Sequence, residues 1–277
     1  MSERPPALLL TVLALGIALL YLPILVMMGA SFNASPLAGT WGGFSTQWYG
    51  ELLGNEQLVD AAWLSLRIAF VAATASVILG TLAAVALVRF TRFRGRMLLR
   101  GMVTAPLVMP EIITGITQLL LLITLFRFIG WPHRGFGTIV LAHVTFCTAY
   151  VTVTVQSRLV SVDRSLEEAA MDLGAGPFGA FMDTTLPIIA PALATSWLLS
   201  LTLSLDDLVI SSFVSGPGAS TLPMLVYSQV KLGVSPDVNA LATLIVTVVG
   251  SGVVVAGWLM QRAERQRALD RQLADRG

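Results

Sequence analysis

The sequence has little charge and almost no cysteine. Only 12% of its 277 residues are charged, 55% are hydrophobic, and the mean hydropathy is +0.79. This composition is too apolar for a soluble domain, whose surface has to be wetted by water. The single cysteine, Cys147, excludes an internal disulfide and a multi-thiol metal site. The net charge of +1 argues against a nucleic-acid-binding surface. The sequence therefore predicts an integral membrane protein.

The sequence also lacks the short motifs of common enzymes. It has no GxxxxGK[ST] phosphate-binding sequence, so it cannot hydrolyse ATP by that route, and it has no GxSxG nucleophile motif. Neither of its two histidines has a second ligand nearby, so no metal site is expected. For His143, which lies in an apolar stretch, we expect local hydrogen bonding. We expect no catalytic residue and no bound cofactor in this chain.

Six apolar stretches are each long enough to cross roughly 30 Å of hydrocarbon as a helix. They predict an all-α membrane protein with a single transmembrane domain over residues 1–277. The first stretch is longer than a signal-peptide core, and we interpret it as an uncleaved span. The predicted spans are residues 7–30, 61–88, 101–126, 136–155, 188–212 and 240–260.

The basic residues are unevenly distributed between the predicted spans. An even number of spans places both termini on one side, and basic residues collect on the cytoplasmic side of membrane proteins. Both termini and the long polar loop at residues 162–187 are therefore predicted to be cytoplasmic. The 13 basic residues on that side, of 17 in all, are Arg4, Arg89, Arg92, Arg94, Arg96, Arg100, Arg158, Arg164, Arg262, Arg265, Arg267, Arg271 and Arg276.

This polar loop carries the signals of two short helices. Asp163 or Ser165 can cap the first helix, and Ser165 with Glu168 has the spacing of a capping box. Gly174 supplies the left-handed backbone position that ends helices. Pro177 suits the first turn of a second helix. The loop is therefore predicted to form two short helices that meet at a glycine elbow.

The second predicted span carries small residues at intervals of four. Such residues let another helix approach the backbone closely, so we interpret this span as a packing helix. The spacing does not say whether the neighbouring helix belongs to the same chain. The small residues are Ala72, Ser76, Gly80 and Ala84.

The third predicted span contains a carboxyl group. Glu111 lies roughly 15 Å along the helix, near the bilayer midplane, where a charge costs roughly 2.5–3.5 kcal/mol. Thr114, Gly115 and Gln118 follow on the same helical face. Two interpretations are equally supported. This stripe lines a polar path through the membrane, or the glutamate is protonated or paired and holds together a helix that two prolines interrupt.

The fifth predicted span has a polar face that ends in two adjacent aspartates. Asp207 continues the face, whereas Asp206 points about 100° away from it. Asp207 is therefore our first candidate for a carboxylate that faces a transport path, at its outer mouth. The alternative is that the serines are a small-residue packing face and both aspartates cap the helix end. The face consists of Ser196, Ser200, Ser204, Asp207 and Ser211, with steps of 4, 4, 3 and 4 residues.

Several residues of the polar loop resemble the EAA loop of ABC importer permeases, a cytoplasmic helix that docks into the ATP-hydrolysing subunit. The resemblance rests on the Glu-Ala-Ala sequence, the glycine four residues after it and the later Leu-Pro pair. The alternative is a loop of an unrelated carrier whose glutamate caps its own helix. The resemblance implies these ATPase-coupling residues: Glu168, Ala169, Ala170, Asp172, Gly174, Leu186 and Pro187.

Four further stretches resemble the polyamine branch of these permeases. They are FSTQWYGEL at 44–52, TAPLVMPEIITG at 104–115, LAHVTFCTAYV at 141–151 and LSLDDLVISSFVSGPG at 203–218. The resemblance implies the type I importer fold in the bacterial inner membrane, with putrescine as the first expected substrate and spermidine as the second. It also implies a second permease subunit, a periplasmic binding protein and two ATPase subunits that bind ATP and Mg. The expected substrate-path residues are Glu111, Asp207, Asp206 and Ser204.

The sequence leaves two alternative functions open. One is a proton-coupled secondary carrier for an organic cation that uses Glu111 and Asp207, because intramembrane carboxylates often serve that purpose. The other is an ABC permease for a different small solute. The polar loop and the absence of repeated halves favour the ABC permease over the carrier.

Overall fold

The computed structural model describes residues 7–36, 40–90, 92–232 and 236–248, together with residues 250, 251, 258 and 262. These residues are almost entirely helical and contain no strand beyond a single antiparallel bridge between Asn33 and Phe44. The elements are α1 (Ala7–Ala30), α2 (Gln47–Gly54), α3 (Glu56–Arg89), α4 (Arg96–Val108), α5 (Glu111–Ile129), α6 (Phe136–Val160), α7 (Ser165–Asp172), α8 (Pro177–Ala180), a π-helical turn (Phe181–Thr185), α9 (Leu186–Leu205), α10 (Val209–Val214) and α11 (Leu222–Leu232).

Five helical segments among the described residues are long and apolar enough to cross a membrane. This confirms the prediction of an all-α membrane protein. Of the sixth predicted span, residues 240–248 belong to a shorter apolar helix at Pro236–Val248. Of its residues 249–260 the structure describes only 250, 251 and 258. The five segments are Leu8–Ala30, Glu56–Arg89, Glu111–Ile129, Phe136–Val160 and Pro177–Leu205.

The chain forms two compact units, one of residues 57–227 and one of residues 1–56 and 228–277. In the second of these units, hydrogen bonds hold the segment after α1 against α2. The indole Nε1 of Trp48 donates to the carbonyl oxygen of Asn33 at 2.7 Å, and the hydroxyls of Ser31 and Tyr49 lie 2.7 Å apart. The functional residues predicted from the sequence all lie in the unit of residues 57–227.

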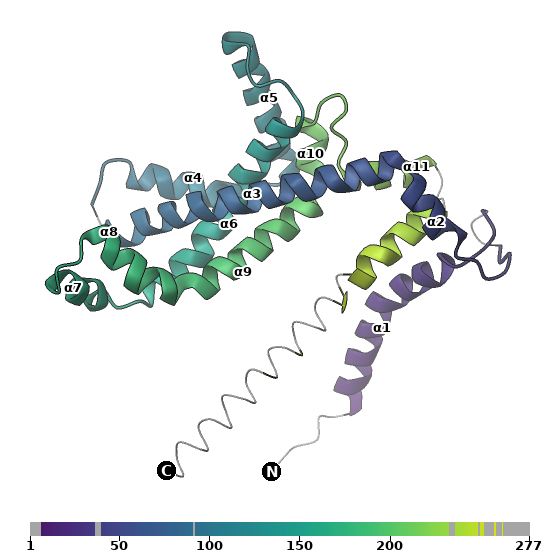
Figure 1. Cartoon of the computed structure of the whole chain (residues 1–277), viewed down its shortest axis with the longest axis horizontal. Coiled ribbons are helices and arrows are strands. Elements are labelled where there is room, and N and C mark those ends of the chain that lie inside the picture. Colours follow the sequence, from purple (N-terminus) through teal and green to yellow (C-terminus); the bar gives the residue numbers. More distant parts are fainter. Residues whose placement is uncertain are drawn as a thin grey trace. The chain divides into compact units, whose positions relative to one another are not determined.

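Within residues 57–227, α6 is the central helix (Figure 1). Its apolar residues supply both hydrophobic clusters of this unit. Ile139 lies in one cluster with residues of α3, α5 and α10, and Val151 and Val155 lie in the other with residues of α3 and α9. All three side chains are fully buried. Because burial of a Val or Ile side chain contributes about 1.5–3 kcal/mol, α6 fixes the positions of the helices around it.

The small residues of α3 face α6 of the same chain, which answers the question that their spacing left open. Ser76 donates its hydroxyl hydrogen to the carbonyl oxygen of Val144 at 3.3 Å. A Cβ atom added at Gly80 would lie 2.6 Å from Cγ1 of Val151, closer than real side chains come. Ala72 and Ala84 are fully buried. The stripe is therefore a packing face within this chain.

The predicted span at 101–126 is not one helix, because the chain bends at the second of the two prolines that interrupt it. α4 ends at Val108 and α5 begins at Glu111, with Met109 and Pro110 in extended conformations between them. A proline has no backbone N–H to continue the helix, and it disfavours helical geometry in the residue before it. In Figure 1, α5 leaves the direction of α4 at this bend.

The prediction of one continuous span at 188–212 is wrong. α9 ends at Leu205, and α10 begins at Val209 after a short connection. At the other end, α9 continues directly from the π-helical turn at Phe181–Thr185. The interruption after Leu205 places both aspartates between two helices.

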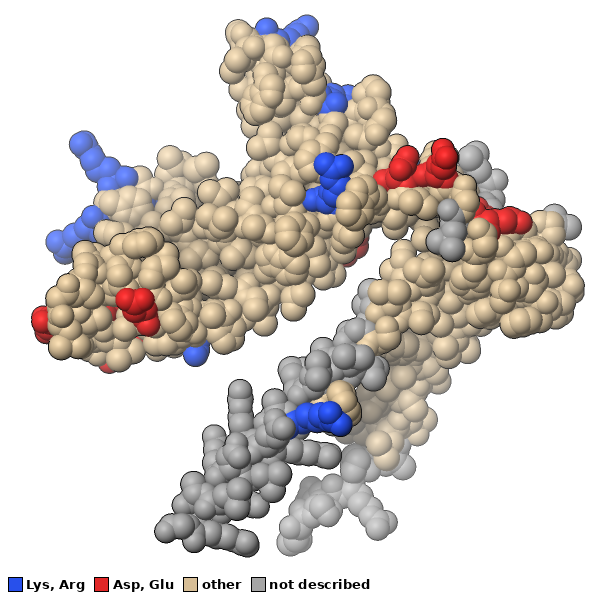
Figure 2. Space-filling model, viewed as in Figure 1, with Lys and Arg blue, Asp and Glu red and all other residues tan. Residues whose placement is uncertain are grey.

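Charged side chains are sparse on the face drawn in Figure 2. They form small, separate patches, and long uncharged stretches lie between these patches. Such a sparsely charged surface suits a protein that contacts lipid, because a charged side chain at the bilayer centre is costly.

Candidate functional sites: a helical elbow and a buried polar network

The first site is the elbow formed by α7 and α8. The backbone N–H of Ser165 donates to Oδ1 of Asp163 at 2.9 Å, and this bond fixes the start of α7. Hydrogen bonds from the backbone and side chain of Ser165 stabilise the ionised carboxylate and lower the pKa of Asp163. The predicted capping box of Ser165 and Glu168 does not form, because Glu168 instead pairs with Arg164, whose Nε lies 3.3 Å from its Oε1. Neither predicted residue occupies the N-cap position, which Arg164 takes without a side-chain cap, and Asp163 instead holds the turn that leads into α7.

The end of α7 confirms the predicted elbow. Gly174 has φ of +95°, and its N–H donates to the carbonyl oxygen of Met171 at 2.9 Å. The N–H of Ala175 donates to the carbonyl oxygen of Ala170 at 3.1 Å. These two bonds form a Schellman motif, which satisfies carbonyl groups at the helix end. Pro177 occupies the first position of α8, as predicted.

The elbow exposes large apolar side chains. None of the residues of α7 is buried within this chain. Leu173 and Phe178, on either side of the glycine turn, are 91% and 73% exposed. An exposed apolar patch on a short structured segment is typical of a protein-binding surface. Glu168, Ala169, Ala170 and Asp172 lie on α7, while Leu186 and Pro187 begin α9.

The residue before the predicted coupling sequence has contacts that the sequence analysis missed. Oε1 of Glu167 accepts a hydrogen bond from Nη2 of Arg89 at 2.9 Å and another from the hydroxyl of Thr185. The side chains of Arg89 and Glu167 are only 14% and 15% exposed. Glu167 therefore joins α7 to the end of α3 and to the π-helical turn before α9.

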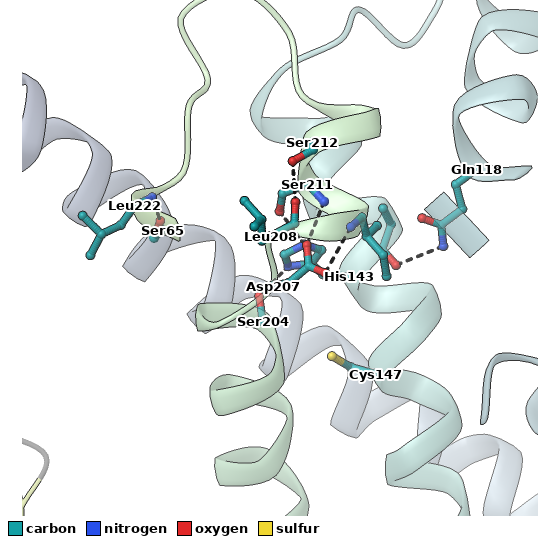
Figure 3. A network of polar contacts seen from close by, with 12 residues as sticks. Ser65, Gln118, His143, Cys147, Ser204, Asp207, Leu208, Ser211, Ser212 and Leu222 are labelled. Carbon is teal, nitrogen blue, oxygen red and sulfur yellow. Dashed lines mark hydrogen bonds and ion pairs between the residues drawn. The ribbon is translucent and has the colours of Figure 1, made fainter. Parts of the chain in front are cut away.

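The second site is a polar network at the break between α9 and α10 (Figure 3). Oδ1 of Asp207 accepts from the backbone N–H of Ile210 at 3.2 Å, and Oδ2 accepts from the N–H of Ser211 at 2.7 Å. Asp207 therefore caps the first turn of α10. Oδ2 also lies 3.2 Å from Nε2 of His143, on α6. The Asp207 side chain is 7% exposed.

His143 connects the three parts of this network. Its Nδ1 lies 2.6 Å from the hydroxyl of Ser204 at the end of α9, and its Nε2 lies 3.0 Å from the hydroxyl of Ser211 in α10. The imidazole is 2% exposed. The prediction of local hydrogen bonding for His143 is confirmed. The network brings Ser204 and Asp207 together and fixes the ends of α9 and α10 against α6.

The two adjacent aspartates have different surroundings. Asp207 turns into the network, whereas Asp206 is exposed. The serine face that continues to Asp207 is also buried, and Ser196 and Ser200 have no exposed surface. The carbonyl oxygen of Ser200 accepts a weak hydrogen bond from Sγ of Cys147 on α6, at 3.7 Å. This geometry supports the alternative interpretation of the serine face as a packing surface, with Asp207 as a cap.

The predicted stripe of α5 is divided between two environments. Glu111 is exposed at the first position of the helix. Gly115 packs so closely against α10 that an added Cβ would lie 2.6 Å from the ring of Phe213. Nε2 of Gln118 donates to the carbonyl oxygen of Ala142 at 3.3 Å. Gly115 and Gln118 therefore hold α5 to α10 and α6. In the part of the chain that the structure describes, no three His, Cys, Asp or Glu side chains are grouped to hold a metal.

Comparison with known proteins identifies the family. Residues 76–268 match the model of the family described as binding-protein-dependent transport system inner membrane component, and the chain belongs to this family. It is the membrane-embedded permease component of an ABC importer, and ATP hydrolysis belongs to a separate subunit.

Curated relatives cover nearly the whole chain. The chain is 59% identical over 269 residues to the putrescine transport system permease protein PotI of Escherichia coli (strain K12), covering 97% of this chain and 96% of the relative. It is 44% identical over 245 residues to the spermidine/putrescine transport system permease protein PotC of the same strain, covering 88% and 90%. The spans, loop and polar network described above therefore belong to a chain that is similar in sequence to polyamine permeases.

Solved structures show the same fold at low sequence identity. One is the crystal structure of a bacterial ABC transporter involved in the import of the acidic polysaccharide alginate. It aligns with a TM-score of 0.71 at 16% identity, covering 92% of this chain and 94% of the other. A second is the crystal structure of an amino acid ABC transporter with histidines, with a TM-score of 0.55 at 19% identity, covering 78% and 97%.

Proposed function

We propose that this permease takes up a polyamine, putrescine first and spermidine second, across the inner membrane by alternating access driven by partner ATPase subunits. The observation that carries the mechanism is the α7–α8 elbow, which buries no residue of α7 and exposes Leu173 and Phe178. The substrate class is supported by the 59% and 44% identity to relatives named as putrescine and spermidine/putrescine permeases.

The elbow is the proposed contact with the ATPase. Glu168 and Asp172 lie on α7, and Leu173 and Phe178 offer apolar side chains beside these charges. A partner groove with complementary apolar and basic groups would bury both kinds of side chain. ATP and Mg would be bound in that partner, since this chain has no GxxxxGK[ST] sequence. The complete importer would hold a second permease, two ATPase subunits and a periplasmic binding protein.

The same proposal sets the orientation in the membrane. The elbow must lie on the cytoplasmic side, where ATP is available, and both termini would then lie there too. The count of basic residues supports this side.

Because the only native thiol, Cys147, is fully buried, a single Leu173→Cys variant gives an interpretable test of this orientation. A membrane-impermeant thiol reagent should label it in inside-out vesicles and not in right-side-out vesicles. The opposite result would reverse the orientation.

The exposed carboxylates are the proposed contacts with the substrate. A diamine carries two ammonium groups on an apolar tether, so separated carboxylates would compensate both charges. Asp206 and Glu111 are exposed, whereas both oxygens of Asp207 are already hydrogen-bonded. We therefore assign substrate contact to Asp206 and Glu111. Asp207 and Ser204 would hold the α9–α10 break in place through His143.

Uptake by a reconstituted importer tests the proposal. The chain, its second permease and the ATPase subunits are placed in liposomes, and labelled putrescine is supplied with the binding protein. Uptake should follow ATP, stop with a non-hydrolysable ATP analogue, and continue when an ionophore collapses the proton gradient. Uptake that follows the proton gradient without ATP would instead show a secondary carrier. ATP-driven uptake of another solute, with putrescine excluded, would refute the substrate.

A further inference from the structure

We infer that Glu167 is a positioning residue that links the coupling helix α7 to two transmembrane helices. This inference deepens the proposed function and rests on it. In the proposed mechanism, movement of the ATPase subunits must pass from α7 into the spans. The contacts of Glu167 give that movement a defined route into α3 and α9.

One carboxylate oxygen makes both connections. Oε1 of Glu167 accepts from Nη2 of Arg89, the last residue of α3, at 2.9 Å. The same oxygen accepts from the hydroxyl of Thr185, the last residue of the π-helical turn that leads into α9. The two donors are 96 residues apart in sequence and share this acceptor atom. We call this arrangement the Glu167 link.

The surroundings of the Glu167 link make it stronger than an ordinary surface pair. Arg89 and Glu167 are 14% and 15% exposed, and Thr185 is fully buried. Hydrogen bonds to a charged group are shorter and stronger than neutral ones, and water screens them less when they are partly buried. In the described chain α7 buries no side chain, so a charged contact rather than apolar packing joins it to α3. Loss of the carboxylate would also leave the guanidinium of Arg89 uncompensated.

The neighbouring glutamate cannot perform this role. Glu168 pairs with Arg164 within the same loop, and their side chains are 58% and 64% exposed. That pair connects α7 only to the residue before it, and an exposed i,i+4 pair contributes little. The two glutamates therefore have separate roles. Glu168 faces outward for a partner, and Glu167 faces inward to the spans.

The contact of Glu167 with Thr185 lies in the π-helical turn that leads into α9. Such turns carry one extra residue inside a helix and are frequent at functional sites. Thr185 closes this turn directly before α9 begins at Leu186. A force on α7 therefore reaches α9 at the residue where the helix changes from π to α geometry.

The test compares coupling in five forms of the reconstituted importer, of which one is a control. The first four are the wild type, Glu167→Gln, Thr185→Val, and the charge exchange of Arg89→Glu with Glu167→Arg. Asp183→Asn is the matched control, because Asp183 is an exposed acidic residue of the same π-helical turn. The measured quantity is the number of ATP molecules hydrolysed per putrescine imported, together with the amount of assembled complex. A merely structural role would lower the amount of complex and leave this ratio unchanged.

We expect Glu167→Gln to raise the ratio about tenfold, because Gln keeps an acceptor oxygen but lacks the negative charge that strengthens the hydrogen bonds to Arg89 and Thr185. Thr185→Val should raise it less, and the charge exchange should restore most of the coupling. An unchanged ratio in both Glu167→Gln and Thr185→Val, with ATP-driven uptake in the wild type, would overturn the Glu167 link alone. If the Glu167→Gln complex does not assemble, the ratio measured for Thr185→Val tests the link alone. A raised ratio supports the Glu167 link, and an unchanged ratio overturns it. A wild type whose uptake does not follow ATP would overturn the proposed function and the link with it.

Discussion

The elbow allows a test of whether its left-handed turn is required for transport, because two glycines in this short loop differ in backbone conformation. Gly174 has φ of +95°, while Gly176, two residues later, has φ of −69°. An added Cβ meets no atom within 4 Å at either position. Substituting alanine at each position therefore separates backbone strain from crowding.

The expected magnitude follows from the left-handed conformation. A residue with a Cβ atom pays about 1–2 kcal/mol to adopt it, so Gly174→Ala should reduce the population of the native elbow about 5- to 30-fold. This strain should destabilise the elbow because α7 has 8 residues and buries none of them. Helices shorter than about 12–15 residues are marginal without tertiary support. Gly174→Val should have at least as large an effect, because branching at Cβ adds further crowding.

The assay is ATP-driven putrescine uptake in liposomes, normalised to the amount of inserted protein. Gly174→Ala should lower uptake by about 5- to 30-fold, by the same conversion. Gly176→Ala should transport like the wild type, because its φ is accessible to any residue. If both alanine variants transported equally well, the left-handed turn would not be required for coupling, and the argument from the elbow would be refuted.

Three further predictions concern other parts of the chain. Asp206→Asn should lower uptake without changing the thermal stability, whereas Asp207→Asn should lower the melting temperature, because only Asp207 caps α10. Equal effects of the two substitutions on the melting temperature would contradict the assignment of Asp206 to the substrate and of Asp207 to the cap. Gly80→Val should destabilise the protein by about 1–3 kcal/mol through its clash with Val151, measured by thermal unfolding in detergent. The hydrogen-bonded Asp163 has a pKa below its usual value of about 3.9, so its contribution to the start of α7 should be fully present above that value and disappear as the pH falls through the lowered pKa. Amide hydrogen exchange of α7 at several pH values, corrected for intrinsic rates, should show this loss in wild type and not in Asp163→Asn.

Features set by neighbouring residues could be predicted from the sequence. Gly174 and Pro177 act through their own backbone geometry, so the elbow was predicted residue by residue and the structure confirms it. The apolar spans were also predicted, because hydropathy depends on a local window. The bend at Pro110 can be only partly predicted. Its proline indicates a weakened helix, but the sequence does not say whether neighbouring helices hold a weakened helix straight.

Features set by distant residues could not be predicted. Glu167 meets Arg89 across 78 residues of sequence, and nothing local distinguishes it from Glu168. The serine face had a continuous helical period up to Ser211, which hid the break after Leu205. Two adjacent aspartates at that point were a weak signal of a cap, but the partner that orients one of them, His143, lies on another helix. These interactions depend on tertiary packing, which periodicity does not report.

The π-helical turn at Phe181–Thr185 also sets a limit on changes in length near the elbow. A helix advances about 100° per residue, so removing one residue from this turn and restoring α geometry would swing everything before it about 100° around the axis of α9. The elbow would then be presented on a different side of the bundle, with its own sequence intact. In this chain the angular position of the elbow thus depends on the number of residues in this turn, and a single deletion would also separate Glu167 from Arg89.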